Sequence, residues 1–430
     1  MYNSTYILII NRVICIIYIA IYLIYNLEYN YAFDFILIFS YVLRLIFTKK
    51  SDSQTFVSYI TIIYLFLGPS ILMIMEKYGD PLLFLALTVL WFDFINHFSR
   101  TKMPHRRIYY PAISRDFGIW LALLFLASIG TPLFGKDQNS IISLFSFTVP
   151  FSISLLYFER IVYSSSLIKI YIMIAIYFII VMIYVLYYWS GFGRLVIGTY
   201  VLMPVLIADR YRDLGLRPWH AAALAPLLLA AAHLSRYGSW GETKDLADGS
   251  SAHHLKLTID LFRSPVYEYF GGFSRFFDQY LLLFLNWFPR EAWLDKPVGL
   301  GYAAVDEWIG RQGYGRGFSV SLGMFGEQLY LLGPYFLISW FGILLTLIIL
   351  RRMIVKLSFT YAAPAIVFDI NLISYVWGGS ATFGSRVWFF VVPLLIVLSI
   401  WRFTGRERAA PVRFLRLQQP ERLGHDHRNA

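Results

Sequence analysis

The sequence predicts an all-α polytopic integral membrane protein. Of its 430 residues, 58% are hydrophobic and only 15% are charged, whereas soluble domains carry about a quarter charged residues. Apolar runs of about 20 residues recur along the chain, and each is long enough to cross the hydrocarbon core of a bilayer. The lysines and arginines, which give a formal net charge of +11, gather in alternate loops. These observations favour about twelve transmembrane helices with both termini in the cytoplasm.

Twelve apolar segments meet the length requirement for a span. In chain order they cover residues 6–25, 31–48, 55–76, 80–96, 117–134, 140–158, 163–187, 192–208, 219–236, 328–350, 357–376 and 386–402. The first segment lacks a cleavage site of small residues, so we interpret it as a retained span and not as a signal peptide. Cys15 lies in this span and is expected to be a packing residue, because a single cysteine forms no internal disulfide.

Basic residues predict the orientation, because cytoplasmic loops are enriched in Lys and Arg. The loops on one side carry Lys49, Lys50, Arg100, Lys102, Arg106, Arg107, Arg115, Arg160, Arg210, Arg212, Arg217, Arg351, Arg352 and Lys356. The short loops on the other side are nearly without cations, with Lys77 and Lys136 as the main exceptions. An even number of spans satisfies this alternation and places both termini in the cytoplasm.

The span pattern divides the chain into four regions. Nine spans occupy residues 1–236, a large loop covers 237–327, three spans occupy 328–402, and a basic cytoplasmic tail covers 403–430. The loop is predicted to face the outside of the cytoplasmic membrane, and its many Trp, Phe and Tyr residues indicate that it is folded. Its segment "FDQYLLLFLNWF" (277–288) is too short to span and is expected to lie against the membrane surface or to dip into it.

Three stretches predicted to lie outside the cytoplasm combine charges with chain-breaking residues. They are "PREAWLDKPVGLG" (289–301), "GYGRGFSVSLGMFGEQLYLLG" (313–333) and "GGSATFGSRVW" (378–388). Glycines and prolines dictate the backbone shape there, and guanidinium groups bind phosphate through a bidentate fork. The pattern predicts a site for a multiply anionic group at one membrane boundary. Its candidate cations are Arg290, Lys296, Arg316 and Arg386, together with Arg194 at the start of the eighth span.

A structural explanation of these cations stays open beside the functional one. Interfacial Arg and Lys side chains anchor helix ends and contact lipid phosphates. Lys296 could also fix the loop through Glu291 or Asp295. The anchoring explanation applies equally well to Arg194, Arg236, Arg263 and Arg275 taken singly.

Other kinds of site have weaker support. The adjacent His253 and His254 lack the spacing of a closed metal site, and the chain has no cysteine cluster, HExxH motif or Walker-type phosphate loop. We therefore expect no metal and no other cofactor. Charged residues inside the spans often line ion or substrate paths, and most here lie near a span end, where they could snorkel. Asp34 and Asp369 are the least easily explained of this group, which comprises Arg12, Asp34, Arg44, Asp93, Lys169 and Asp369.

The stretch "FPREAWLDKPVGLGY", followed by "GFSVSLGMFGEQLYLLGPYF", resembles the O-antigen polymerase and oligosaccharide repeat unit polymerase families. The likeness covers roughly residues 286–342 and Arg386, and its core is a Pro-Arg…Trp…Lys-Pro motif that leads into a Gly-Glu segment. Arg290 and Gly301 match the arginine-and-glycine pattern of loops in this family, but no second copy occurs in another external loop. The resemblance implies a GT-C-like polymerase or ligase architecture in the bacterial inner membrane.

The activity that the resemblance implies is glycosyl transfer at the periplasmic face. A growing glycan on undecaprenyl diphosphate is transferred onto the non-reducing end of a new lipid-linked repeat unit. Arginines and a lysine would stabilise the diphosphate leaving group, and Trp293 and Tyr302 would stack on sugar rings. A carboxylate would accept the proton of the attacking hydroxyl, with Glu327 as first candidate and Asp295 as second. Glu327 could equally be a helix N-terminal residue that is stabilised by the helix dipole.

The implied partners are undecaprenyl-diphosphate-linked oligosaccharides, a chain-length regulator and a flippase, and no nucleic acid is expected. An O-antigen ligase, which transfers the glycan to lipid A-core, is the nearest alternative, and His253 or His254 would then matter more. A polysaccharide flippase or transporter would show two similar halves and charges spread through its spans. A transferase that uses polyprenyl-monophosphate sugars would need an acidic motif in the first external loop, where "NLEYN" supplies only Glu28.

Overall fold

The protein is helical throughout the part that the computed structural model describes. Those residues are 2–25, 31–48, 53–75, 81–99, 113–133, 141–188, 194–221, 253–263, 272–288, 292–309, 321–358 and 361–404. No residue in these ranges lies in a β-strand. The helices are α1 (Tyr2–Tyr25), α2 (Tyr31–Phe47), α3 (Ser53–Ile62), the π-helix η1 (Ile63–Leu67), α4 (Gly68–Met75), α5 (Leu82–Phe98), α6 (Ile113–Leu133), α7 (Ile141–Ser164), α8 (Leu167–Tyr188), α9 (Arg194–Arg212), α12 (His253–Arg263), α13 (Gly272–Leu285), α14 (Leu300–Ile309), α15 (Gly323–Leu332), the 3₁₀ turn η3 (Gly333–Tyr335), α16 (Phe336–Leu357) and α17 (Ala363–Phe403).

The helices follow the predicted spans closely. Each of the first eight predicted spans coincides with a helix, and the third is built from α3, η1 and α4 in succession. Within the described residues, four helical stretches are long and apolar enough to cross a membrane: 54–71, 167–185, 323–357 and 363–403. These features make the chain an all-α membrane protein. The predicted span 219–236 lies mostly outside the described residues.

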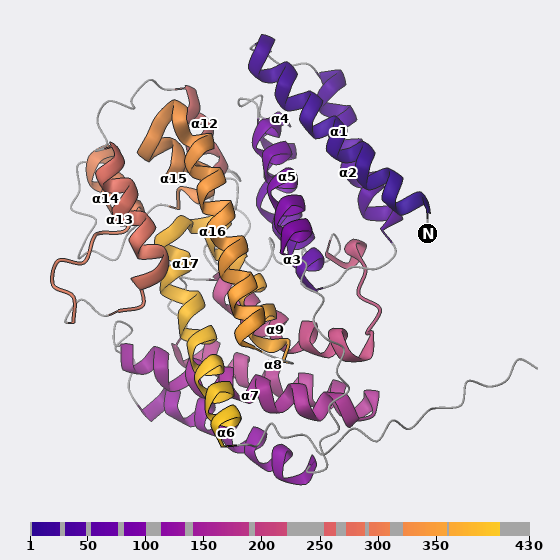
Figure 1. Cartoon of the computed structure of the whole chain (residues 1–430), viewed down its shortest axis with the longest axis vertical. Helices are drawn as coiled ribbons and strands as arrows, with labels where there is room; N and C mark the ends of the chain where they lie inside the picture. The colour runs from indigo at the N-terminus through magenta and orange to yellow at the C-terminus, as the bar shows by residue number, and fades with distance from the viewer. Residues whose placement is uncertain are drawn as a thin grey trace, which may run out of the picture.

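The helices form groups around the pair α16 and α17 (Figure 1). Helices α1 and α2 lie together on one side, next to α3–α5, while α13 and α14 lie on the other side. Helix α12 lies between these groups, because Phe262 contacts both Phe84 of α5 and Phe336 of α16. Helices α6, α7 and α8 run across the lower end of α17 at a steep angle to it. The described helices therefore do not share a single direction.

Helix α17 is a hairpin of two antiparallel arms. The rings of Tyr361 and Trp401, which flank its two ends, lie 5.6 Å apart, whereas a straight helix would separate residues at this spacing by about 60 Å. The chain reverses at Gly379, whose φ of 75° and ψ of −166° are not helical. The two predicted spans 357–376 and 386–402 thus correspond to the two arms. The turn between them is so tight that no separate loop remains.

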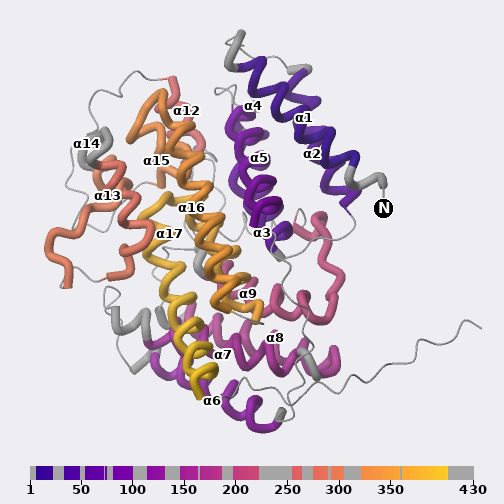
Figure 2. The backbone as a smooth tube through the Cα atoms, viewed as in Figure 1, coloured from indigo at the N-terminus to yellow at the C-terminus, as the bar shows by residue number. Residues whose placement is uncertain are grey.

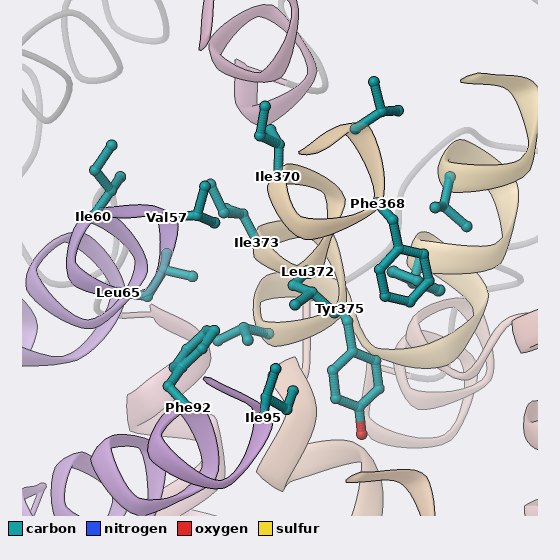
Figure 3. Packing of buried hydrophobic residues seen from close by; sticks show 14 of the residues in the cluster. Val57, Ile60, Leu65, Phe92, Ile95, Phe368, Ile370, Leu372, Ile373 and Tyr375 are labelled. Atoms are coloured by element: carbon teal, nitrogen blue, oxygen red, sulfur yellow. The ribbon is translucent and has the colours of Figure 1, made fainter. Parts of the chain in front are cut away.

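The first arm of α17, residues 363–378, forms the centre of the described core. Almost every side chain in it is buried, as expected for a helix that is apolar on all faces. Ile373 extends toward Val57 of α3 (Figure 3). The reversal at Gly379 is therefore attached to a rigid, densely packed arm.

The chain also folds back between α15 and α16. The rings of Phe325 and Trp340 lie 6.2 Å apart, although a straight helix would place these residues about 22 Å apart. Gly333, with a φ of 51°, ends α15, and Pro334 follows it. The long helix α16 therefore begins at Phe336, and Glu327 lies in the short helix α15 that precedes it.

The predicted external loop contributes short helices that pack on the hairpin. Helix α13 runs beside the second arm of α17 (Figure 2), and Leu282 and Leu283 are fully buried. The hydroxyls of Tyr280 and Thr346 lie 2.6 Å apart, which brings α13 next to the middle of α16. The expected position of segment 277–288, against the membrane surface or dipping into it, stays a prediction.

Candidate functional site

The reversal of α17 brings described residues of the stretches 313–333 and 378–388 together with Asn286, which directly precedes the remaining stretch. Asn286 Nδ2 donates to the carbonyl of Ala381 at 2.6 Å, and the hydroxyl of Ser321 donates to the carbonyl of Trp377. Glu327 contacts Ser380. We call residues 377–381 the hairpin tip. Segments that are almost a hundred residues apart in the sequence meet at this tip.

Glu327 binds the start of the second arm of α17. Its carboxylate accepts hydrogen bonds from the backbone N–H of Ser380 at 2.8 Å and from the Ser380 hydroxyl at 2.5 Å. The side-chain amide of Gln328 donates a third bond at 3.1 Å. The first N–H groups of a helix have no partner within the helix, and an anionic side chain there also interacts favourably with the helix dipole. Glu327 therefore caps the second arm from a different helix.

Gly379 makes this contact possible for two reasons. Its positive φ is a conformation that residues with a side chain rarely adopt. In addition, a Cβ atom at this position would overlap the Glu327 carboxylate. Both requirements select glycine at the tip, so the carboxylate can approach the backbone.

Lys296 stabilises the loop after α13. Its Nζ atom donates to the carbonyls of Asn286 and Phe288 at 2.6 and 2.7 Å. Carbonyls at a helix C-terminus lack partners within the helix and attract a cation. Lys296 thus fixes the loop through backbone carbonyls at the end of α13, and Glu291, one of the two partners that the sequence suggested, lies outside the described residues. Its predicted role at a diphosphate stays a prediction.

Further contacts attach the loop and α13 to the hairpin. The side chain of Gln279 donates to the carbonyl of Val298 at 2.9 Å and accepts from the N–H of Leu300 at 3.1 Å. Trp388 Nε1 donates to the carbonyl of Leu283 at 2.9 Å. A side chain at Gly384 would overlap the backbone of α13. The second arm of α17 is therefore held by α13 along its outer half.

Arg386 lies six residues beyond Ser380 on the second arm and is only partly exposed. Its Nη1 atom reaches the hydroxyl of Ser374 at 3.4 Å, and Tyr184 and Tyr200 lie close enough to interact with it electrostatically. Among the residues that the structure describes, no Asp or Glu forms an ion pair with it. The positive charge is thus surrounded by hydroxyl groups and aromatic rings.

Other arginines in the helices have aspartate partners. Arg44 binds Asp93 at 2.5 Å, and Arg12 contacts the same carboxylate at 3.0 Å. Arg160 pairs with Asp116 at 3.0 Å, and Arg351 pairs with Asp369 at 2.6 Å. A buried charge without a partner is costly, so these aspartates have a clear structural role. Arg386 differs from all four arginines.

Two charges that the sequence left as candidates for a transport path have structural partners. Asp369 binds Arg351 through both oxygens, at 2.6 and 2.9 Å. Arg351 also donates to the carbonyl of Ser99 at the end of α5. Asp34 accepts a hydrogen bond from the Tyr18 hydroxyl at 2.8 Å. These contacts explain both aspartates as links between helices.

The remaining predicted residues are distributed as follows. Asp295 is exposed, while Trp293 and Tyr302 are partly exposed in the same loop. Arg290 and Arg316 lie outside the described residues, and so does the side chain of Arg194, whose backbone begins α9.

His254, which the ligase alternative would use, is buried against Gly323, Phe66 and Trp377. The side chain of His253 lies outside the described part of the chain.

Ser380 and Asn286 are site residues that the sequence reasoning did not identify. The double glycine at 378–379 was a signal for a backbone contact at Ser380, because glycine commonly permits the close approach of another group. Asn286 had no comparable signal, because its partner is a backbone carbonyl 95 residues away.

No family model, curated protein or solved structure matches the chain. Within the described residues, no group of three or more His, Cys, Asp or Glu side chains could hold a metal ion. The chemistry of the site must therefore be argued from its own residues.

Proposed function

We propose that the protein is a glycosyltransferase of the bacterial inner membrane that elongates a surface polysaccharide. It transfers a growing glycan from undecaprenyl diphosphate onto the non-reducing end of a new lipid-linked repeat unit. The resemblance of residues 286–342 to repeat unit polymerases supports this activity, and so do the contacts of Asn286 and Glu327, two described residues of this range, with the hairpin tip.

The single observation that carries the proposal is the environment of Arg386. Ionisable residues inside a membrane protein usually pair with one another or serve a ligand, and within the described residues Arg386 lacks a carboxylate partner. Arg386 lies about 9 Å along the arm from Ser380. A lipid diphosphate at the membrane boundary has the charge and the position to pair with it, and the guanidinium fork fits phosphate oxygens.

The proposed topology has twelve spans, cytoplasmic termini and a periplasmic hairpin tip. It rests on the charge alternation, and contacts between predicted cytoplasmic ends support it. Glu159, at the end of α7, accepts hydrogen bonds from the N–H groups of Ala362 and Ala363 at 2.6 and 2.9 Å. Arg352, at the end of α16, donates to the carbonyl of Phe98.

Further contacts of this kind pair Arg212 with Val162, and Gln54 with Ser99. In each case the loops nearest to both partners are on the side with the basic residues.

In the proposed reaction, the bond between the anomeric carbon of the donor glycan and the diphosphate oxygen breaks. The acceptor hydroxyl forms the new glycosidic bond, and undecaprenyl diphosphate leaves. Arg386, with Arg290 and Arg316, stabilises the leaving group. Asp295, a carboxylate that is exposed in the loop, accepts the proton of the acceptor hydroxyl, whereas Glu327 is only 2% exposed.

Deletion of the gene tests the proposal against its alternatives. Loss of a polymerase should leave lipid A-core that carries a single repeat unit on a gel of the surface polysaccharide. Loss of a ligase should leave core without any repeat unit, and loss of a flippase should block export. Either of the last two patterns would overturn the proposed activity.

A further inference from the structure

Glu327 is buried, whereas a carboxylate that accepts a proton from a substrate must be accessible to that substrate. Only 2% of the residue is exposed, and its oxygens accept three hydrogen bonds from Ser380 and Gln328. Burial of a carboxylate is costly unless hydrogen bonds compensate. Glu327, Ser380 and the positive-φ Gly379 thus together hold the start of the second arm.

Arg386 depends on that start for its position. It lies six residues after Ser380, so about 9 Å of continuous helix joins the cap to the guanidinium-bearing residue. Its one hydrogen bond within the described residues, to Ser374, crosses from the second arm to the first at 3.4 Å. A rotation or shift of the second arm at Ser380 would therefore move Arg386 relative to the first arm.

The contacts of α13 restrict the same segment from its other side. Trp388 binds the carbonyl of Leu283, and Asn286 binds the carbonyl of Ala381. These contacts fix the start of the arm against α13, and the Glu327 cap fixes it against α15. Loss of the cap therefore removes a direct bond between the start of the arm and α15.

We propose that Glu327 is a positioning residue, which acts through Ser380 to orient Arg386 toward the diphosphate of the lipid-linked substrate. This inference rests on the proposed function, because it takes the diphosphate as the ligand of Arg386. In this role Glu327 contributes to catalysis indirectly and is not the catalytic base. A catalytic base and a positioning residue predict different behaviour for the same variants of Glu327.

The test uses purified full-length protein in detergent and undecaprenyl diphosphate as the titrated probe, with tryptophan fluorescence as the readout. Glu327→Leu should weaken binding by about 10-fold or more, because the N–H of Ser380 loses its partner. Glu327→Gln should stay within about threefold of the wild type, because the amide oxygen can still accept from that N–H. Arg386→Ala should weaken binding at least as much as Glu327→Leu does.

The double variant separates an indirect effect from an independent one. If Glu327 acts only through Arg386, Glu327→Leu combined with Arg386→Ala should bind no more weakly than Arg386→Ala alone. The inference would be overturned if the losses of affinity in the two single variants multiplied in the double variant. It would also be overturned if Glu327→Leu bound undecaprenyl diphosphate as tightly as the wild type. Absence of binding by the wild-type protein would instead overturn the proposed function.

Glu159→Leu is the matched control for stability. Glu159 caps the first arm of α17 through Ala362 and Ala363, at the opposite end of the hairpin. The variant Glu159→Leu should lower the melting temperature but leave the binding of undecaprenyl diphosphate unchanged. Equal loss of binding in Glu159→Leu and Glu327→Leu would mean that general loosening of the hairpin is the cause, and the positioning role would be wrong.

The elongation rate gives a second, independent readout. A base at position 327 predicts that Glu327→Gln loses on the order of 10²–10⁴ in kcat. Positioning predicts a nearly normal kcat in Glu327→Gln, an unchanged pH profile, and a raised KM for the lipid-linked donor in Glu327→Leu. A fall in kcat of the larger size in Glu327→Gln would restore the catalytic assignment.

Discussion

The rings of Tyr361 and Trp401 lie 5.6 Å apart at the two ends of α17. Because 40 residues separate them, the helix must reverse, and the non-helical backbone of Gly379 marks the place. Both predicted cytoplasmic ends of the hairpin thus meet next to α7, where Tyr157 also contacts Trp401. The tip at the opposite end receives Glu327, Asn286 and Ser321.

The hairpin makes the proposed topology testable with reporter fusions. A reporter fused after residue 250 or 310 should be active outside the cytoplasm, and one fused after residue 355 or 410 should be active inside. The expectation follows from the charge alternation between loops. A cytoplasmic signal at residue 310 would remove the candidate site from the face where the lipid-linked substrate is proposed to lie.

Gly379→Ala should destabilise the protein strongly. The new side chain would sit at a positive φ and overlap the Glu327 carboxylate, so we expect a loss of at least about 2 kcal/mol in the free energy of unfolding. Gly342→Ala is the matched control, because it lies on the exposed face of α16 with no atom within 4 Å of the added Cβ. Melting of the two purified variants in detergent compares them, and equal melting temperatures would contradict this view of the tip.

Asp369→Ala should cost about 3–5 kcal/mol in stability, because Arg351 would be left buried without its partner. The combined replacement Asp369→Leu and Arg351→Met should recover much of that loss. Arg352→Ala, at the neighbouring exposed position, should change stability by less than about 1 kcal/mol. If Asp369→Ala were stable but blocked polysaccharide export, Asp369 would belong to a transport path and not to a structural ion pair.

Arg290→Ala or Arg316→Ala should abolish long polysaccharide chains while protein abundance stays near normal. Both residues belong to the stretches that resemble repeat unit polymerases. Arg290→Lys should rescue poorly, since an ammonium group cannot reproduce the planar guanidinium fork. The checks are a gel of surface polysaccharide and an immunoblot of membranes. Normal chain lengths in Arg290→Ala would rule out its role at the diphosphate.

The sequence predicted the helices well, because long apolar runs and basic loops are strong local signals. It also predicted which stretches would gather, since their glycines, prolines and charges stand out from the apolar background. The break in the helix after Glu327 was not predicted. The pair Gly333-Pro334 ends α15 after that residue, and this pair is a recognisable helix-breaking signal.

The partners of individual charges were beyond what the sequence could predict. Lys296 binds two backbone carbonyls, and backbone groups carry no residue-specific signal. Asp369 and Arg351 lie on different helices, so their pairing depends on how α16 packs against α17. For the same reason, only the folded structure shows that Arg386 has no Asp or Glu partner among the described residues.

Elongation by the purified protein tests the central claim most directly. The wild-type protein in liposomes is given a single undecaprenyl-diphosphate-linked repeat unit, and the length of the glycan products is measured. We predict a ladder of longer chains with release of undecaprenyl diphosphate. Arg386→Ala should slow elongation by about 10²–10³, while Arg402→Ala, at the other end of the same arm, should elongate normally. A wild-type protein that leaves the repeat unit unextended, or an Arg386→Ala variant that extends it at the normal rate, would contradict the account.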